Sequence, residues 1–70
     1  MTTIEVLANH ISKFEANITL KADYSEEIEA LDSFESDVRV FQHLNAPVWK
    51  CRDMLNKIKG IRAWISEETH

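Results

Sequence analysis

Apolar side chains recur every three or four residues along the first part of the chain. The series is Ile4, Leu7, Ile11, Phe14 and Ile18. This spacing places one apolar stripe on an α-helix, and we predict a helix over 3–21. Thr2 and Glu5 have the spacing of a capping box, with Thr2 as N-cap. Residues 18–24 also alternate apolar and polar side chains, so a short strand is the alternative at that end.

A second periodic segment follows and predicts a helix over 25–44. Its apolar stripe consists of Ile28, Leu31, Phe34, Val38 and Phe41. Asp23 or Ser25 can cap this helix, and the acids of its first turns suit the positive end of the helix dipole. Val40 and Leu44 widen the apolar face near the carboxyl end, which indicates that the helix is covered on two sides there.

The clearest break in the chain is Asn-Ala-Pro at 45–47. Proline fits the first turn of a helix and disfavours helical geometry in the residue before it, so one helix ends by Leu44 and the next begins near Pro47. We predict the third helix over 47–66, with Gly60 as the place for a kink or a close helix contact. Its apolar stripe consists of Val48, Cys51, Met54, Leu55, Ile58, Ile61 and Ile65.

Three helical segments joined by short connections predict an all-α fold. The arrangement we expect is a small up-down-up three-helix bundle, or a helical hairpin unit, that spans residues 1–70 as one domain. An α+β fold with two short strands near 18–23 and 37–41 is the alternative. The low glycine and proline content argues against an all-β fold, which needs many tight turns.

Short length limits how much this fold can stabilise itself. A single core in a chain of 70 residues rarely supplies more than about 3 to 5 kcal/mol, and one cysteine cannot form an internal disulfide. Several large apolar side chains also exceed what one seam of three helices covers, namely Val40, Leu44, Trp49 and Trp64. We therefore expect a homodimer.

Charge is distributed unevenly along the chain. Residues 1–45 carry nine acids and three bases, whereas residues 46–70 carry three acids and five bases. The net charge of −4 disfavours a general nucleic-acid coat but leaves local patches of either sign for a partner. The apolar runs are too short for a membrane span or a signal-peptide core, so we expect a cytoplasmic protein without membrane contact.

Few residues have the pattern of a catalytic or metal site. The side chains that prefer zinc are His10, His43, His70 and Cys51, and none has the spacing of a zinc motif. Cys51 lies on an apolar stripe, where a buried thiol is inert. A chain with one glycine has no glycine-rich phosphate loop. We expect no enzyme activity, no cofactor and no metal.

Two features indicate protein binding instead. Seven acids lie within the fifteen residues 23–37, a face that suits a basic partner, and we take Glu26, Glu29 and Asp32 as its contacts. Trp49 and Trp64 lie about 100° or more from the centre of their helix's apolar stripe, where tryptophan is a common binding anchor. Val40 and Leu44 complete the expected partner-binding set.

These features favour a small non-catalytic regulator, inhibitor or adaptor that masks a surface of a larger protein. Short chains of this kind are often encoded by phages or mobile elements. The alternative is a DNA-associated transcriptional regulator that uses the basic third helix, with Lys50, Arg52, Lys57 and Lys59 as contacts. Those bases are scattered around the helix, which makes nucleic acid the less favoured partner. A pure oligomerisation module is the second alternative.

Overall fold

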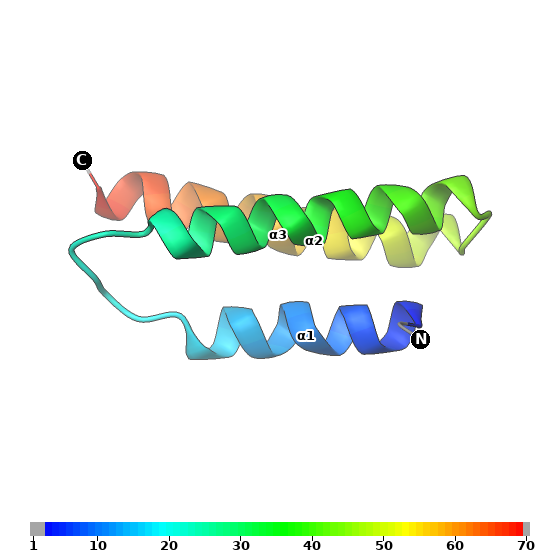
Figure 1. Ribbon diagram of the computed structural model, residues 1–70, viewed down its shortest axis with the longest axis horizontal. Coiled ribbons are helices and arrows are strands. Elements are labelled where there is room, and N and C mark those ends of the chain that lie inside the picture. The colour runs from blue at the N-terminus through cyan, green and yellow to red at the C-terminus, as the bar shows by residue number, and fades with distance from the viewer. Residues whose placement is uncertain (1–2, 70) are drawn as a thin grey trace.

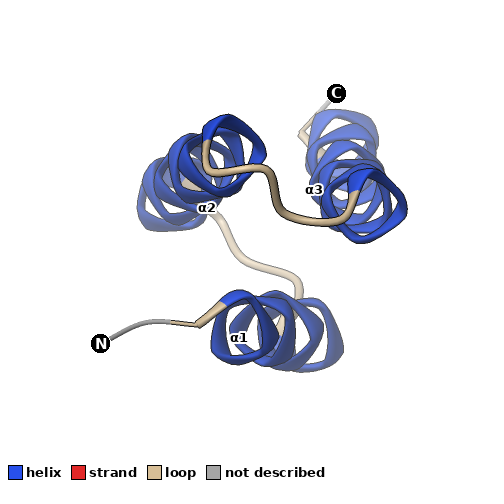
Figure 2. Cartoon of the chain, turned by 90° about the vertical axis from the view of Figure 1, so that its right-hand side faces the viewer, coloured by secondary structure: helices blue, strands red, loops and turns tan. Residues whose placement is uncertain are grey.

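A computed structural model describes residues 3–69 of the chain. It contains the helices α1 (Ile4–Asn17), α2 (Ser25–His43) and α3 (Val48–Glu68), which run up, down and up along one long axis (Figure 1). Each helix packs against both others, as the view along the bundle shows (Figure 2). The predicted all-α three-helix bundle is confirmed, and residues 3–69 form no strand at either alternative position.

Helix α1 is shorter than the predicted 3–21: it begins one residue later and ends four residues earlier. Thr2 lies outside the described residues, and Thr3 is the N-cap, with its hydroxyl oxygen accepting the Val6 N–H at 3.2 Å. The helix stops at Asn17, so the predicted extension to residue 21 is wrong.

The early end of α1 allows Tyr24 to reach the core. Tyr24 is only 3% exposed, and its hydroxyl oxygen accepts the Lys21 N–H at 2.9 Å. Its ring meets the Trp64 ring edge-on, with 5.9 Å between centroids. If α1 continued for another turn after Asn17, the backbone N–H of Lys21 would be part of the helix and could not donate to the Tyr24 hydroxyl. Residues 18–24 are therefore a fixed connection that is neither helix nor strand.

Helix α2 begins with a carboxylate at its first amide. Tyr24 occupies the N-cap position without a side-chain cap bond, while the Asp23 carboxylate accepts the Ser25 N–H at 3.0 Å and the Ser25 hydroxyl at 2.6 Å. These two bonds hold the pKa of Asp23 below its usual value. Asp23 thus does the capping from one position earlier than a regular N-cap.

The turn between α2 and α3 lies at the predicted break and is a Schellman motif. The Ala46 N–H donates to the Phe41 carbonyl at 3.0 Å and the Asn45 N–H to the Gln42 carbonyl at 3.1 Å. Asn45 has a φ of 65°, the left-handed conformation that asparagine tolerates better than most residues. Pro47 is the N-cap of α3, so the helices end and begin within one residue of the predicted positions.

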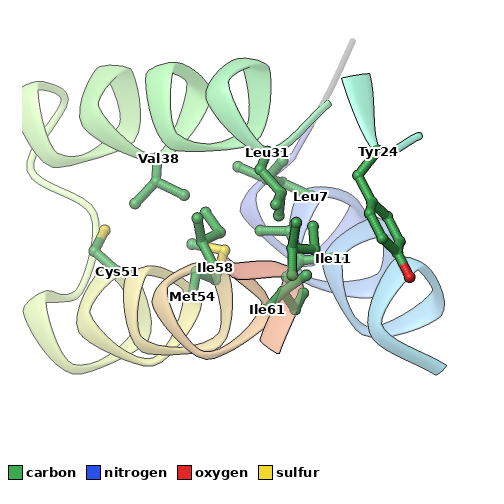
Figure 3. Close-up of a cluster of buried hydrophobic side chains, with 10 residues drawn as sticks. Leu7, Ile11, Tyr24, Leu31, Val38, Cys51, Met54, Ile58 and Ile61 are labelled. Atoms are coloured by element: carbon green, nitrogen blue, oxygen red, sulfur yellow. The ribbon is translucent and has the colours of Figure 1, made fainter. Parts of the chain in front are cut away.

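One apolar core lies between the three helices (Figure 3). Its buried members are Leu7, Ile11, Tyr24, Leu31, Val38, Cys51, Met54, Ile58, Ile61 and Ile65. The predicted stripes supply nearly all of them. Two residues of the predicted stripes do not belong to the core, because Ile28 is 45% and Val48 is 69% exposed. Both lie in a first helical turn, where fewer neighbouring turns are available to cover a side chain.

Gly60 lies in the middle of α3 and faces outward. A Cβ built there would meet nothing within 4 Å, and α3 continues through it as one helix. The predicted close helix contact at Gly60 is therefore absent among residues 3–69. The fold of one chain gives no reason for a glycine at this position.

The left-handed conformation of Asn45 makes the turn sensitive to one side chain. Asn45→Gly should leave stability unchanged or slightly higher, because glycine adopts this φ without strain. Asn45→Val should lower the free energy of unfolding by about 1–2 kcal/mol, the cost of the left-handed region for an ordinary residue. Urea unfolding followed by circular dichroism measures both. Equal stability of the two variants would contradict the Schellman turn.

Candidate interaction surfaces

Some acids of residues 23–37 form ion pairs that link helices of the bundle. Arg62 of α3 pairs with Glu35 and with Asp32 of α2, and Arg39 reaches Glu35 at 2.9 Å. The hydrogen bond from Arg62, and to a smaller extent the one from Arg39, holds the pKa of Glu35 below its ordinary range. Asp32, predicted as a partner contact, thus belongs to an ion-pair cluster that links α2 to α3.

Glu27 is the second acid with a structural role. It is 8% exposed and pairs with the Lys21 ammonium from the connection between α1 and α2. The hydrogen bond from Lys21 lowers the pKa of Glu27, and the same bond raises the pKa of Lys21. This pair fastens the connection to the first turn of α2.

The other side of α2 carries exposed residues in a row, which we call the α2 outer face. It consists of Glu26, Glu29, Ser33, Ser36, Val40 and Leu44. Val40 and Leu44 are 55% and 67% exposed, and they line an open hollow of about 480 Å³ with Ser36, Arg39 and His43. Four of the seven predicted partner contacts therefore share one face.

The two predicted tryptophan anchors have different environments. Trp49 is 67% exposed, with the Lys50 ammonium 5.9 Å from its ring centroid. Trp64 packs against the core and against Tyr24. Trp49 lies on the side of α3 opposite its core stripe, so it faces away from α2. It therefore lies on a different side of the bundle from the α2 outer face. The predicted binding residues thus divide into two separate surfaces.

The bases of α3 do not form one stripe. The Lys50 ammonium lies 4.0 Å from Glu5, and the Lys57 ammonium donates to the Ser12 hydroxyl at 2.9 Å. Both residues lie towards α1. Arg52 and Lys59 are exposed and lie nearer the α2 side, in keeping with the scatter expected from the sequence.

A hollow between α1 and α3 is a site that the sequence pattern did not reveal. It has a volume of about 330 Å³ and is lined by Glu15, Ile18, Gly60, Ile61 and Trp64. The lone glycine of the chain is the one sequence signal that marks it. The absence of a side chain at Gly60 leaves this hollow open along the outer side of α3.

Within residues 3–69, no three histidine, cysteine or acidic side chains come together in a way that could hold a metal ion. No helix in that range has the length and apolar content needed to cross a membrane. Comparison with protein-family models, curated proteins and solved structures finds no match to this chain.

The ion pairs predict how stability depends on pH. Lysine and arginine partners lower the pKa of Glu27 and Glu35 in the folded state. Their contribution to stability is therefore complete above the unfolded glutamate pKa of about 4.3 and is lost as the pH falls through the lower folded-state values. Thermal unfolding between neutral pH and about pH 3 should show a falling midpoint.

Variants separate these pairs from the general effect of acid. Glu27→Gln and Glu35→Gln should each lower the midpoint at neutral pH and make its fall at acid pH shallower. Glu29→Gln is the matched control, because Glu29 is exposed and makes no ion pair with any described residue. A profile that stays as steep when Glu27→Gln and Glu35→Gln are combined would contradict the assignment.

Proposed function

We propose that this protein is a small non-catalytic binding module, a regulator, inhibitor or adaptor that acts by covering a surface of a larger protein. The observation that carries the proposal is the hollow on the α2 outer face, with Val40 and Leu44 exposed at its rim. An exposed apolar patch bordered by polar residues is typical of a protein interface. Polar neighbours such as Ser36 and His43 can satisfy hydrogen bonds at the edge of the contact.

The size and shape of this patch suit an inserted side chain. Val40 and Leu44 are four residues apart, so they lie one above the other on the helix surface. A partner that places an apolar side chain between them would remove both from water, and burial of each side chain stabilises the complex. The hollow is open and shallow enough to be filled by a protein surface.

Charge supports the choice of partner. Glu26 and Glu29 lie on the same face, nearer the amino end of α2, and neither makes an ion pair with any described residue. Complementary charges at the edge of an interface speed association and fix orientation more than they raise affinity. The expected partner therefore has an apolar protrusion flanked by basic side chains.

Binding of this kind requires no chemistry from the chain. A bundle of 38 × 20 × 17 Å covers an area comparable to a standard protein interface when one long side is buried. The partner is then blocked sterically at the covered surface, or is brought together with whatever else the module contacts.

The test compares proteins captured from the source lysate, after nuclease treatment, by three forms of the tagged chain. Val40→Ser/Leu44→Ser should lose a stoichiometric partner that the wild type retains. Val48→Ser is the matched control, because Val48 is equally apolar and exposed but lies on α3, and it should retain the partner. With the purified partner, the double variant should bind about tenfold or more weakly.

Salt and charge variants then examine the acidic half of the face. Glu26→Gln/Glu29→Gln should slow association and flatten its dependence on ionic strength, with little change in dissociation. Retention of the partner by the Val40→Ser/Leu44→Ser variant would refute the proposal. In a parallel capture without nuclease, recovery of nucleic acid in place of a protein would instead favour the basic third helix.

A further inference from the structure

Helix α3 has an outer stripe that remains exposed among residues 3–69. The stripe steps along the helix by four and three residues and consists of Trp49, Asp53, Asn56, Gly60, Ala63 and Glu67, all exposed. This spacing keeps the residues on one side of the helix, as in helices that pack against another helix. The largest side chain, Trp49, stands near the amino end, and Gly60, which has no side chain, lies near the middle of the helix.

Two positions of this stripe, Trp49 and Gly60, complement each other in shape. Trp49 projects from the first turn and is 67% exposed. Gly60 borders the hollow of about 330 Å³ between α1 and α3, a space equal to about ten water molecules and therefore adequate for an indole ring. Glycine destabilises the helix here, and no described residue lies close enough to a Cβ at this position to require it.

We propose that two copies of this chain associate as an antiparallel, two-fold dimer through α3, with Trp49 of each copy filling the hollow of the other. A two-fold axis makes the two insertions identical, so one complementary pair of features serves twice. Ile18, Ile61 and Trp64 provide the apolar walls of the hollow. The hollow thus obtains an occupant that residues 3–69 of its own chain do not supply.

The sequence register of α3 supports this arrangement. Leu55 lies midway between Trp49 and Ile61 in the sequence. An antiparallel pairing centred on Leu55 therefore seats Trp49 beside the partner's Ile61. Asp53 and Lys57 are also symmetric about Leu55, so the same pairing places Asp53 opposite the partner's Lys57.

These two side chains suit an ion pair between copies. Asp53 makes no ion pair with any described residue. The Lys57 ammonium donates to the Ser12 hydroxyl, a neutral acceptor, and Lys57 remains exposed. A charge pair at this position would form twice in the dimer and would fix its antiparallel direction.

A second pair follows from the position of Trp49. The Lys50 ammonium lies beside the Trp49 ring, so it accompanies the ring towards the partner. Glu15 lines the hollow that receives the ring. Among the described residues, the Lys50 ammonium has one ion-pair partner, an exposed Glu5 at 4.0 Å. Insertion of Trp49 therefore brings an ammonium group towards a carboxylate.

The dimer and the proposed function use different surfaces. Trp49 and the hollow lie on the outer side of α3, whereas Val40 and Leu44 lie on the α2 outer face. The dimer leaves both copies of the α2 outer face open, so each interaction can be lost without the other.

The first experiment measures molecular mass in solution by sedimentation equilibrium over a wide concentration range. Trp49→Ala should weaken the dimer about tenfold or more, as truncation of a buried tryptophan anchor does. Gly60→Gln should have a similar effect, because its side chain occupies the hollow while its Cβ meets nothing in the monomer. Circular dichroism verifies that both variants stay helical.

Matched controls separate insertion from general surface changes. Val48→Ala truncates an exposed apolar neighbour of Trp49, and Ser33→Gln adds the same glutamine to the α2 outer face. Both should dimerise like the wild type. The tryptophan emission of the wild type should shift to shorter wavelength as the concentration rises, whereas that of Trp49→Ala, which comes from Trp64 alone, should not.

A charge exchange tests the antiparallel register. Asp53→Lys and Lys57→Asp should each weaken the dimer, because each places like charges opposite one another. The double variant should recover affinity, since the exchanged residues can pair again across the two-fold axis. A merely structural role for either residue gives no such recovery.

A wild-type chain that remains monomeric at every concentration overturns the dimer. So does a dimer that is insensitive to both Trp49→Ala and Gly60→Gln, or one that the double charge exchange fails to restore. Val40→Ser/Leu44→Ser should still dimerise, so loss of partner capture by that variant concerns the proposed function alone.

Discussion

All three helices depend on one core to which each contributes side chains that no single neighbour could cover. Leu7 and Ile11 come from α1, Leu31 and Val38 from α2, and Ile58 from α3, and all are at most 1% exposed. In so short a chain this core must offset the conformational entropy of every ordered residue. The connections therefore have to hold the helices in register, through the Schellman turn at one end and Tyr24 at the other.

The elements that local chemistry determines were predictable. Apolar periodicity identified the three helices, and Pro47 located the turn between the second and the third, because both signals act within a few residues. The end of α1 was not predictable in this way. Ile18 continues the helical spacing, but burial of Tyr24 and the Lys21–Glu27 pair outweigh it, and these contacts depend on how the helices pack.

The candidate surfaces show the same limit. Spacing correctly placed Trp49 away from the core stripe of α3, since the angle around a helix follows from sequence alone. Val40 and Leu44, predicted to widen the covered face of α2, are 55% and 67% exposed in the single chain. Spacing could not show that Arg62 would bind Asp32, or that Val40 and Trp49 would lie on separate surfaces. Those results require the positions of neighbouring helices. The hollow beside Gly60 likewise forms between two helices distant in sequence.

Burial of Cys51 has a kinetic consequence. Its thiol is 0% exposed and lies between α2 and α3 near their shared turn (Figure 3). A thiol reagent can reach it only while the helices separate, so its modification rate is set by the frequency of that opening. The modification rate of the Cys51 thiol therefore measures how often the α2–α3 end of the bundle opens.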